Sequence, residues 1–232
     1  RQALMEFAQF RLLSPPPGAP DEDWRNVGEA LRDAARTGEI DPGLPILAKL
    51  AQAWAIQDVT AFNNNVIALR QVSQTRRPAA LSEADAEHLF NKVQPFYVGM
   101  VIYVLALMLV FGSWLGRPAL LQPLAFSILL AGTFVHTGGL IWRVILQGRP
   151  PVTNLYSSAV FVGWGAVVLG VVLERMYRKG FGTAVAAASG FASLIVAHHL
   201  ASDGDTMEMM RAVLDSNFWL ATHVVTITIG YS

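Results

Sequence analysis

The side chains best suited to chemistry in this 232-residue chain are its five histidines. The chain contains no cysteine, which excludes disulfides, iron–sulfur sites, thiolate haem ligation and thiol catalysis for this sequence. Imidazole is the usual neutral axial ligand of haem iron and also a common proton carrier. One histidine, His88, lies in a polar stretch, and we expect a structural or solvated role for it. The other four, His136, His198, His199 and His223, lie in an apolar stretch, where an ionisable side chain is costly without a partner or a function.

The elements that position these histidines follow from a change of composition along the chain. Hydrophobic residues make up 53% and charged residues 15% of the sequence, against about 25% charged in a soluble domain. The deficit falls on residues 95–232, whereas residues 1–94 are ordinary and polar. The net charge of zero gives no argument for a nucleic-acid partner. We therefore predict an all-α fold, with a soluble helical segment (1–94) before a polytopic transmembrane helical bundle (95–232).

Helical spacing of apolar residues and capping residues predict four short amphipathic helices in residues 1–94. Asp21 should cap the first helix and Gly38 should end it, while Asp58 should cap the third. A capping-box pattern at 82–85 should open the fourth. The expected ranges are about 22–36, 46–55, 58–76 and 82–90. Such helices fit a small bundle or a helix-hairpin array. Their sequences contain no motif that indicates a particular ligand.

Long apolar runs predict four complete membrane spans and the start of a fifth. A helix needs about 20 residues to cross a bilayer, and the run from Asn217 has sixteen, so we expect that span to continue beyond Ser232. The fourth run is rich in small residues, which favours close helix contact. The complete spans are expected at about 96–115, 119–142, 155–173 and 181–200.

Charged residues between the spans predict their orientation. The turn at 174–180 has three basic residues and one acid, so we place it in the cytoplasm. The loop at 201–216 has four acids and one arginine, so we place it outside. Alternation then puts residues 1–94 outside, together with the 143–154 loop, whose two arginines alone would favour the inside. In this topology the four histidines of the apolar region gather toward the outer face.

These outer ends carry the residues of a possible haem site. Two histidines from different helices could hold one haem, and Arg143 and Arg149 could pair with its propionates, which guanidinium suits well. Aromatic side chains such as Trp219 could cover the porphyrin. The alternatives stay open at this point: helix–helix hydrogen bonds for His136 and His223, and interfacial anchoring for the two arginines.

Three motifs also carry a resemblance to a known family. They are HTGGLIWR at 136–143, GRPPVTNLYS at 148–157 and NFWLATHV at 217–224. In combination they resemble the CcsA/ResC-type cytochrome c biogenesis proteins of system II, over roughly residues 88–232. The family pattern often has Glu after the Asn-Leu-Tyr triplet, and here Ser157 follows it.

The resemblance implies a haem-handling protein of the inner (cytoplasmic) membrane, and the charge pattern between the spans places its N-terminal segment extracytoplasmic. Haem, as heme b, would be carried to the outer face and presented to apocytochrome c for covalent attachment, with a CcsB/ResB-type membrane partner or fused domain. It implies that His223 ligates the haem iron. The thioether bonds would form on the apocytochrome's own thiols.

The resemblance further implies that a tryptophan-rich motif and more histidines follow Ser232. Haem lyase (synthase) activity would then belong to the complete protein, and this segment alone is expected to be inactive. Two other classes of function stay open: a membrane scaffold subunit with a helical extracytoplasmic docking domain, and a transporter with a proton-coupled histidine.

Overall fold

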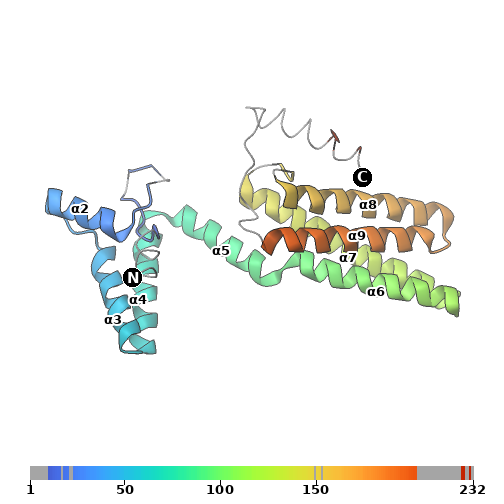
Figure 1. Cartoon of the computed structure of the whole chain (residues 1–232), viewed down its shortest axis with the longest axis horizontal. Coiled ribbons are helices and arrows are strands. Elements are labelled where there is room, and N and C mark those ends of the chain that lie inside the picture. Colours follow the sequence, from blue (N-terminus) through green and yellow to red (C-terminus); the bar gives the residue numbers. More distant parts are fainter. Residues whose placement is uncertain are drawn as a thin grey trace. The chain divides into compact units, whose positions relative to one another are not determined.

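A computed structural model describes residues 10–16, 18–20, 23–148, 150–152, 154–202, 226, 227 and 230. These residues are helical apart from turns and connections, with one isolated bridge between Leu13 and Arg25 (Figure 1). The chain divides into two compact units, which we call the N-terminal unit, Arg1–Ala86, and the membrane unit, Glu87–Ser232. The prediction of an all-α polytopic membrane protein is confirmed.

The N-terminal unit has a small apolar core. Leu13, Ala30 and Leu44 are buried together, with Val27 and Leu47 packed against them. The helices α3 and α4 form a hairpin (Figure 1), and α4 itself buries none of its residues. The helices of this unit are α2 (Val27–Thr37), α3 (Gly43–Ala55), α4 (Val59–Arg76) and the first turns of α5 (Pro78–Val93).

An ionic cluster around Asp41 supplements this small core. The Asp41 side chain is 6% exposed and its Oδ2 accepts hydrogen bonds from Arg25 Nη2 at 2.7 Å and Arg76 Nη1 at 3.0 Å. Its Oδ1 accepts the backbone N–H of Gly43 at 2.8 Å, at the start of α3. Arg76 also donates to the carbonyl of Ser14 at 2.9 Å. One carboxylate therefore joins the N-terminal loop, the start of α3 and the end of α4.

The helix boundaries correct two predictions. The first helix begins at Val27 and its cap is Asn26, with a capping box to Glu29, because the residues just before it pair with Leu13 in an extended strand-like contact. The fourth begins at Pro78, since proline suits the first position of a helix. The 82–85 pattern thus lies inside a helix and opens none. The caps predicted at Gly38 and Asp58 are confirmed.

The membrane unit contains the predicted spans. Within the described residues, four helices are long and apolar enough to cross a bilayer. Short connections make successive helices antiparallel, α6 packs beside α7, α8 beside α9, and α6 also contacts α9 (Figure 1). The helices are α6 (Pro95–Leu115), α7 (Pro118–Gln147), α8 (Leu155–Tyr177) and α9 (Phe181–Ser202).

Small residues allow α8, α9 and α6 to approach closely. A Cβ on Gly170 would lie 2.6 Å from the Cβ of Ala186, and one on Gly190 would lie 2.7 Å from Tyr103 Cε2. No side chain larger than hydrogen fits at these two positions without a shift of the neighbouring atoms. Close backbone approach through small residues is a usual basis of helix association in membranes.

A buried carboxylate closes the turn between α8 and α9. Glu174, in the last turn of α8, accepts the backbone N–H of Gly180 at 2.8 Å and that of Thr183 at 3.1 Å. These donors belong to the start of α9, where backbone N–H groups have no partner within the helix. Glu174 thereby fixes the turn that carries the basic cluster of 174–180.

Candidate functional site

A pocket lies at one end of the membrane unit. Because the helices are antiparallel, the starts of α6 and α8 and the ends of α7 and α9 meet at the same end. The pocket there has a volume of about 370 Å³, and we call it the end pocket. Its walls are mainly aromatic and aliphatic, with a few polar groups, as is usual for small-molecule sites. Its lining includes Phe90, Phe96, Tyr97, Arg143, Tyr156 and His198.

Arg143 is the charged group of the end pocket. It lies in the last turns of α7 and is 2% exposed, and its guanidinium carbon is 4.6 Å from the ring centroid of Tyr156 on α8. A cation over an aromatic face within about 6 Å is held by the ring quadrupole. The guanidinium is therefore buried and held in place against one wall of the pocket.

His136 lies deeper in the bundle and is completely buried. Its Nε2 is 3.1 Å from the carbonyl oxygen of Val160 on α8, and its Nδ1 is 3.1 Å from the hydroxyl of Tyr103 on α6. A carbonyl can only accept, so Nε2 carries the proton and donates, and Nδ1 accepts from the tyrosine hydroxyl. The neutral ring thus joins three helices, and iron ligation through either nitrogen would break a buried hydrogen bond.

Hydroxyl groups extend this polar interior along α7. Trp164 Nε1 donates to Thr137 Oγ1 at 2.9 Å, and Thr137 Oγ1 donates to the carbonyl of Thr133 at 2.7 Å. The sequence alone assigned no role to Tyr103. Its partner could have been anticipated, because Tyr103 lies near the middle of an apolar run, where a hydroxyl needs a hydrogen-bond partner.

Two edge-to-face ring contacts connect His136 to the end pocket. The Phe96 ring lies 5.7 Å from the His136 ring and 6.4 Å from the Tyr156 ring, centroid to centroid. Phe96 and Tyr156 both line the pocket. His136 therefore supports the floor of the pocket and does not line it.

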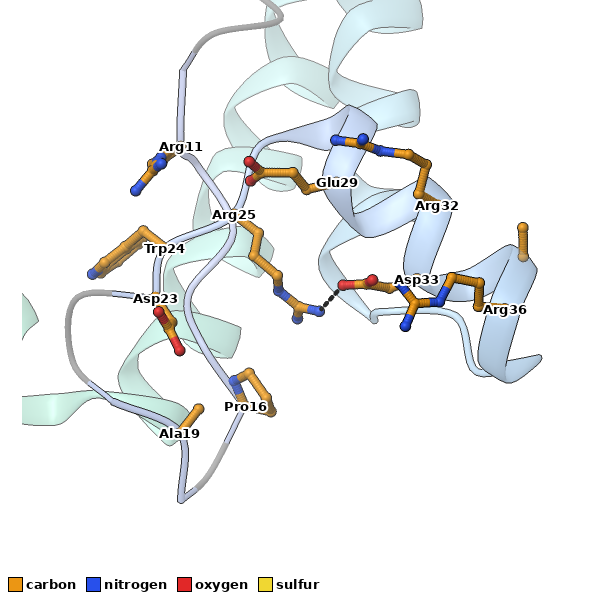
Figure 2. Close-up of a pocket in the computed structure, with 11 residues that line it drawn as sticks. Arg11, Pro16, Ala19, Asp23, Trp24, Arg25, Glu29, Arg32, Asp33 and Arg36 are labelled. Carbon is orange, nitrogen blue, oxygen red and sulfur yellow. Dashed lines mark hydrogen bonds and ion pairs between the residues drawn. The ribbon is translucent and has the colours of Figure 1, made fainter.

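A second hollow, of about 710 Å³, lies in the N-terminal unit and is lined by charges of both signs (Figure 2). Figure 2 shows Arg25 reaching Asp33, and the two side chains are 3.4 Å apart. Glu29 accepts the backbone N–H of Asn26 within the α2 capping box. Alternating charges at partly exposed positions are typical of a solvated surface, so the end pocket is the stronger candidate site.

Comparison with known proteins identifies relatives. No protein-family model matches the chain. It is 31% identical to cytochrome c biogenesis protein CcsA of Prochlorococcus marinus (strain NATL2A) over 112 residues, which is 46% of this chain and 34% of that protein. It is 32% identical to CcsA of Cycas taitungensis over 105 residues, 43% of this chain and 32% of that protein. Protein NrfI of Wolinella succinogenes is 26% identical over 254 residues, 99% of this chain and 26% of that protein.

The chain is of the CcsA type. It spans about a third of the length of the CcsA relatives and about a quarter of NrfI. The match to NrfI covers both units of this CcsA-type chain, so the N-terminal unit is also similar to a part of NrfI. The resemblance expected from the three sequence motifs is confirmed.

The structure separates the site residues predicted for this CcsA-type chain. Arg143 lines the end pocket, and His136 lies behind Phe96. His223, Trp219 and Arg149 lie outside the described residues, so their roles stay predictions.

The two adjacent histidines of α9 differ in position. His198 lines the end pocket, with its ring 6.5 Å from that of Tyr97. His199 is exposed, and its Nδ1 lies 2.9 Å from the carbonyl oxygen of Ile195 in its own helix. Of the pair, His198 is the one placed to meet a ligand in the pocket.

Proposed function

We propose that this CcsA-type chain serves cytochrome c maturation by delivering haem to the outer face of the membrane. There the haem would be presented to apocytochrome c for covalent attachment. The names of the relatives support the process, since both CcsA proteins are called cytochrome c biogenesis proteins. The observation that carries the proposal for this segment is the buried Arg143 guanidinium in a mainly aromatic and aliphatic pocket.

The lining of the end pocket suits one edge of haem. Haem is a flat apolar macrocycle that carries two carboxylates, and a guanidinium binds carboxylate oxygens through paired N–H groups. The pocket combines such a group with rings that can cover apolar surface. Its volume of about 370 Å³ is toward the low end for ligand sites. We therefore assign it the propionate edge, with Arg143 as the carboxylate partner and Arg149 as a second.

His223 is the proposed iron ligand, with Trp219 beside it covering the porphyrin. For His136 we propose a positioning role, because its two ring nitrogens already bond Tyr103 and Val160. It would keep Phe96 and Tyr156, and through them the pocket wall, in place. The bound cargo would be heme b, and the reaction centre would be the apocytochrome's own thiols.

The setting of the protein is part of the same proposal. The chain is a multi-pass membrane protein, and we place it in the inner (cytoplasmic) membrane with the N-terminal unit outside. A CcsB/ResB-type partner or fused domain would complete it, and lyase activity would belong to the complete assembly. The helical N-terminal unit is then available to meet apocytochrome c.

The test is the absorption spectrum of the full-length protein purified from membranes. A histidine-ligated haem gives a Soret band, and His223→Ala should weaken it strongly. His88→Ala is the matched control, since His88 is an exposed histidine of α5, and it should leave the band unchanged. Arg143→Gln should weaken haem binding by about tenfold, the loss expected for charged hydrogen bonds. A colourless wild-type protein, or equal spectra for His223→Ala and His88→Ala, would contradict the proposal.

A further inference from the structure

The turn between α3 and α4 presents three large apolar side chains to solvent. Trp54 is 66% exposed, Ile56 is 68% exposed and Val59 is 70% exposed. We call residues 54–59 the hairpin tip. Single exposed apolar residues are ordinary on a protein surface, but several gathered on one turn mark a surface that contacts something apolar.

The hairpin tip lies in a nearly uncharged stretch of sequence. Between Lys49 and Arg70 the only charged side chain is Asp58. That carboxylate is already used, because its Oδ1 accepts the backbone N–H of Ala61 at 2.9 Å and caps α4. Asp58 is therefore the one charged side chain of the tip, and the exposed area of its other large side chains is mainly apolar.

Several backbone N–H groups of the hairpin tip are paired within the hairpin itself. The N–H of Gln57 donates to the Trp54 carbonyl at 3.1 Å, and the N–H of Asp58 donates to the Ala53 carbonyl at 2.9 Å. The Gln57 side chain donates to the same Trp54 carbonyl at 3.1 Å. Unpaired backbone groups make immersion in lipid costly, and this turn has few donors left to desolvate.

We propose that the hairpin tip inserts into the interfacial layer of the lipid bilayer. Tryptophan is enriched at that layer because its ring is apolar and its N–H is polar, and apolar side chains around it add buried area. The chain is anchored in a bilayer by its own four candidate spans, so the tip needs no separate membrane-targeting signal. Only residues 77–94 separate α4 from α6, and their helix of 16 residues is about 24 Å long.

The test uses the full chain in nanodiscs of neutral phosphatidylcholine. Since the chain has no cysteine, Ile56→Cys can be labelled at one position with an environment-sensitive fluorophore. Lipids that carry a nitroxide on the acyl chain should quench about half of this emission if the tip reaches the interface. Gln74→Cys, an exposed position near the other end of α4, is the matched control and should be quenched little.

A second pair of variants separates insertion from simple proximity. In the labelled Ile56→Cys chain, Val59→Asp should abolish the quenching, because it removes an exposed apolar side chain and adds a second carboxylate beside Asp58. Gln71→Asp, another exposed position of α4, should leave it unchanged. Equal quenching at positions 56 and 74 would overturn the proposal. So would absence of quenching in these nanodiscs, which contain no partner protein, because that is the result expected if the tip docks on a protein instead.

Discussion

The two units of the chain hold their helices together by different means. In the N-terminal unit, a small core is supplemented by charged groups that meet at Asp41. In the membrane unit, helices approach through glycine and alanine, and the buried His136 and Tyr103 and the partly buried Thr137 make neutral hydrogen bonds. The comparison shows that the surrounding solvent decides which interactions can hold helices together. Partly exposed ion pairs are compatible with water, whereas hydrocarbon favours close packing and polar groups that are hydrogen-bonded within the protein.

The largest effect should come from removing the central charge of the N-terminal unit. Asp41→Ala leaves Arg76 partly buried without its carboxylate and leaves Arg25 only its longer pair with Asp33, which should cost about 3 kcal/mol of unfolding free energy. Hydrogen–deuterium exchange of the full chain should show faster exchange in α2 to α4 and unchanged exchange in α6 to α9. Asp33→Ala is the control, since its pair with Arg25 is longer and about half exposed, and it should cost less than about 1 kcal/mol. Equal effects of the two variants would show that the buried carboxylate of Asp41 has no special role in holding the N-terminal unit together, and would contradict the proposed difference between the units.

A smaller effect is expected from enlarging a glycine in the membrane unit. Gly170→Ala places a methyl group against Ala186 and should cost about 2 kcal/mol by overpacking. Gly138→Ala is the matched control, because a Cβ there meets no atom within 4 Å and alanine favours the helix. Thermal unfolding in detergent should separate the two variants. If Gly170→Ala unfolds no earlier than Gly138→Ala, close contact is not what joins α8 to α9.

The smallest effect should come from one neutral hydrogen bond. Tyr103→Phe removes the hydroxyl that donates to His136 and leaves Nδ1 without that donor, at a cost of about 1 kcal/mol. Tyr97→Phe, on the same helix but half exposed, is the control and should be close to neutral. The same unfolding measurement applies. A larger loss for Tyr97→Phe would show that the buried polar contacts contribute little to the bundle.

Hydropathy was sufficient to locate the four spans, because a long apolar run has few alternatives to a membrane helix. Local capping at Gly38 and Asp58 was predictable for a similar reason, since both act within one turn. The start of α2 was not, because the extended pairing of Arg25 with Leu13 is a contact between separated segments.

The end pocket could be anticipated only in part. Topology brings Arg143 and His198 to one end of the bundle, as the sequence predicted for their helices. The cation–π contact with Tyr156 and the two partners of His136 depend on helix rotation, which periodicity alone does not fix. Residues of the site could therefore be predicted from the sequence more readily than the side chains and carbonyls that they contact.

The position of Phe90 has a practical consequence for dissecting the protein. Composition suggests cutting before Pro95, yet Phe90 at the end of α5 is 6% exposed, lines the end pocket and lies 5.5 Å from the Trp142 ring. A shortened protein that starts at Pro95 would lack part of one wall of the pocket, and the Trp142 ring would lose its contact with Phe90. Excision of the membrane unit should therefore begin no later than Glu87, where the compact unit itself begins.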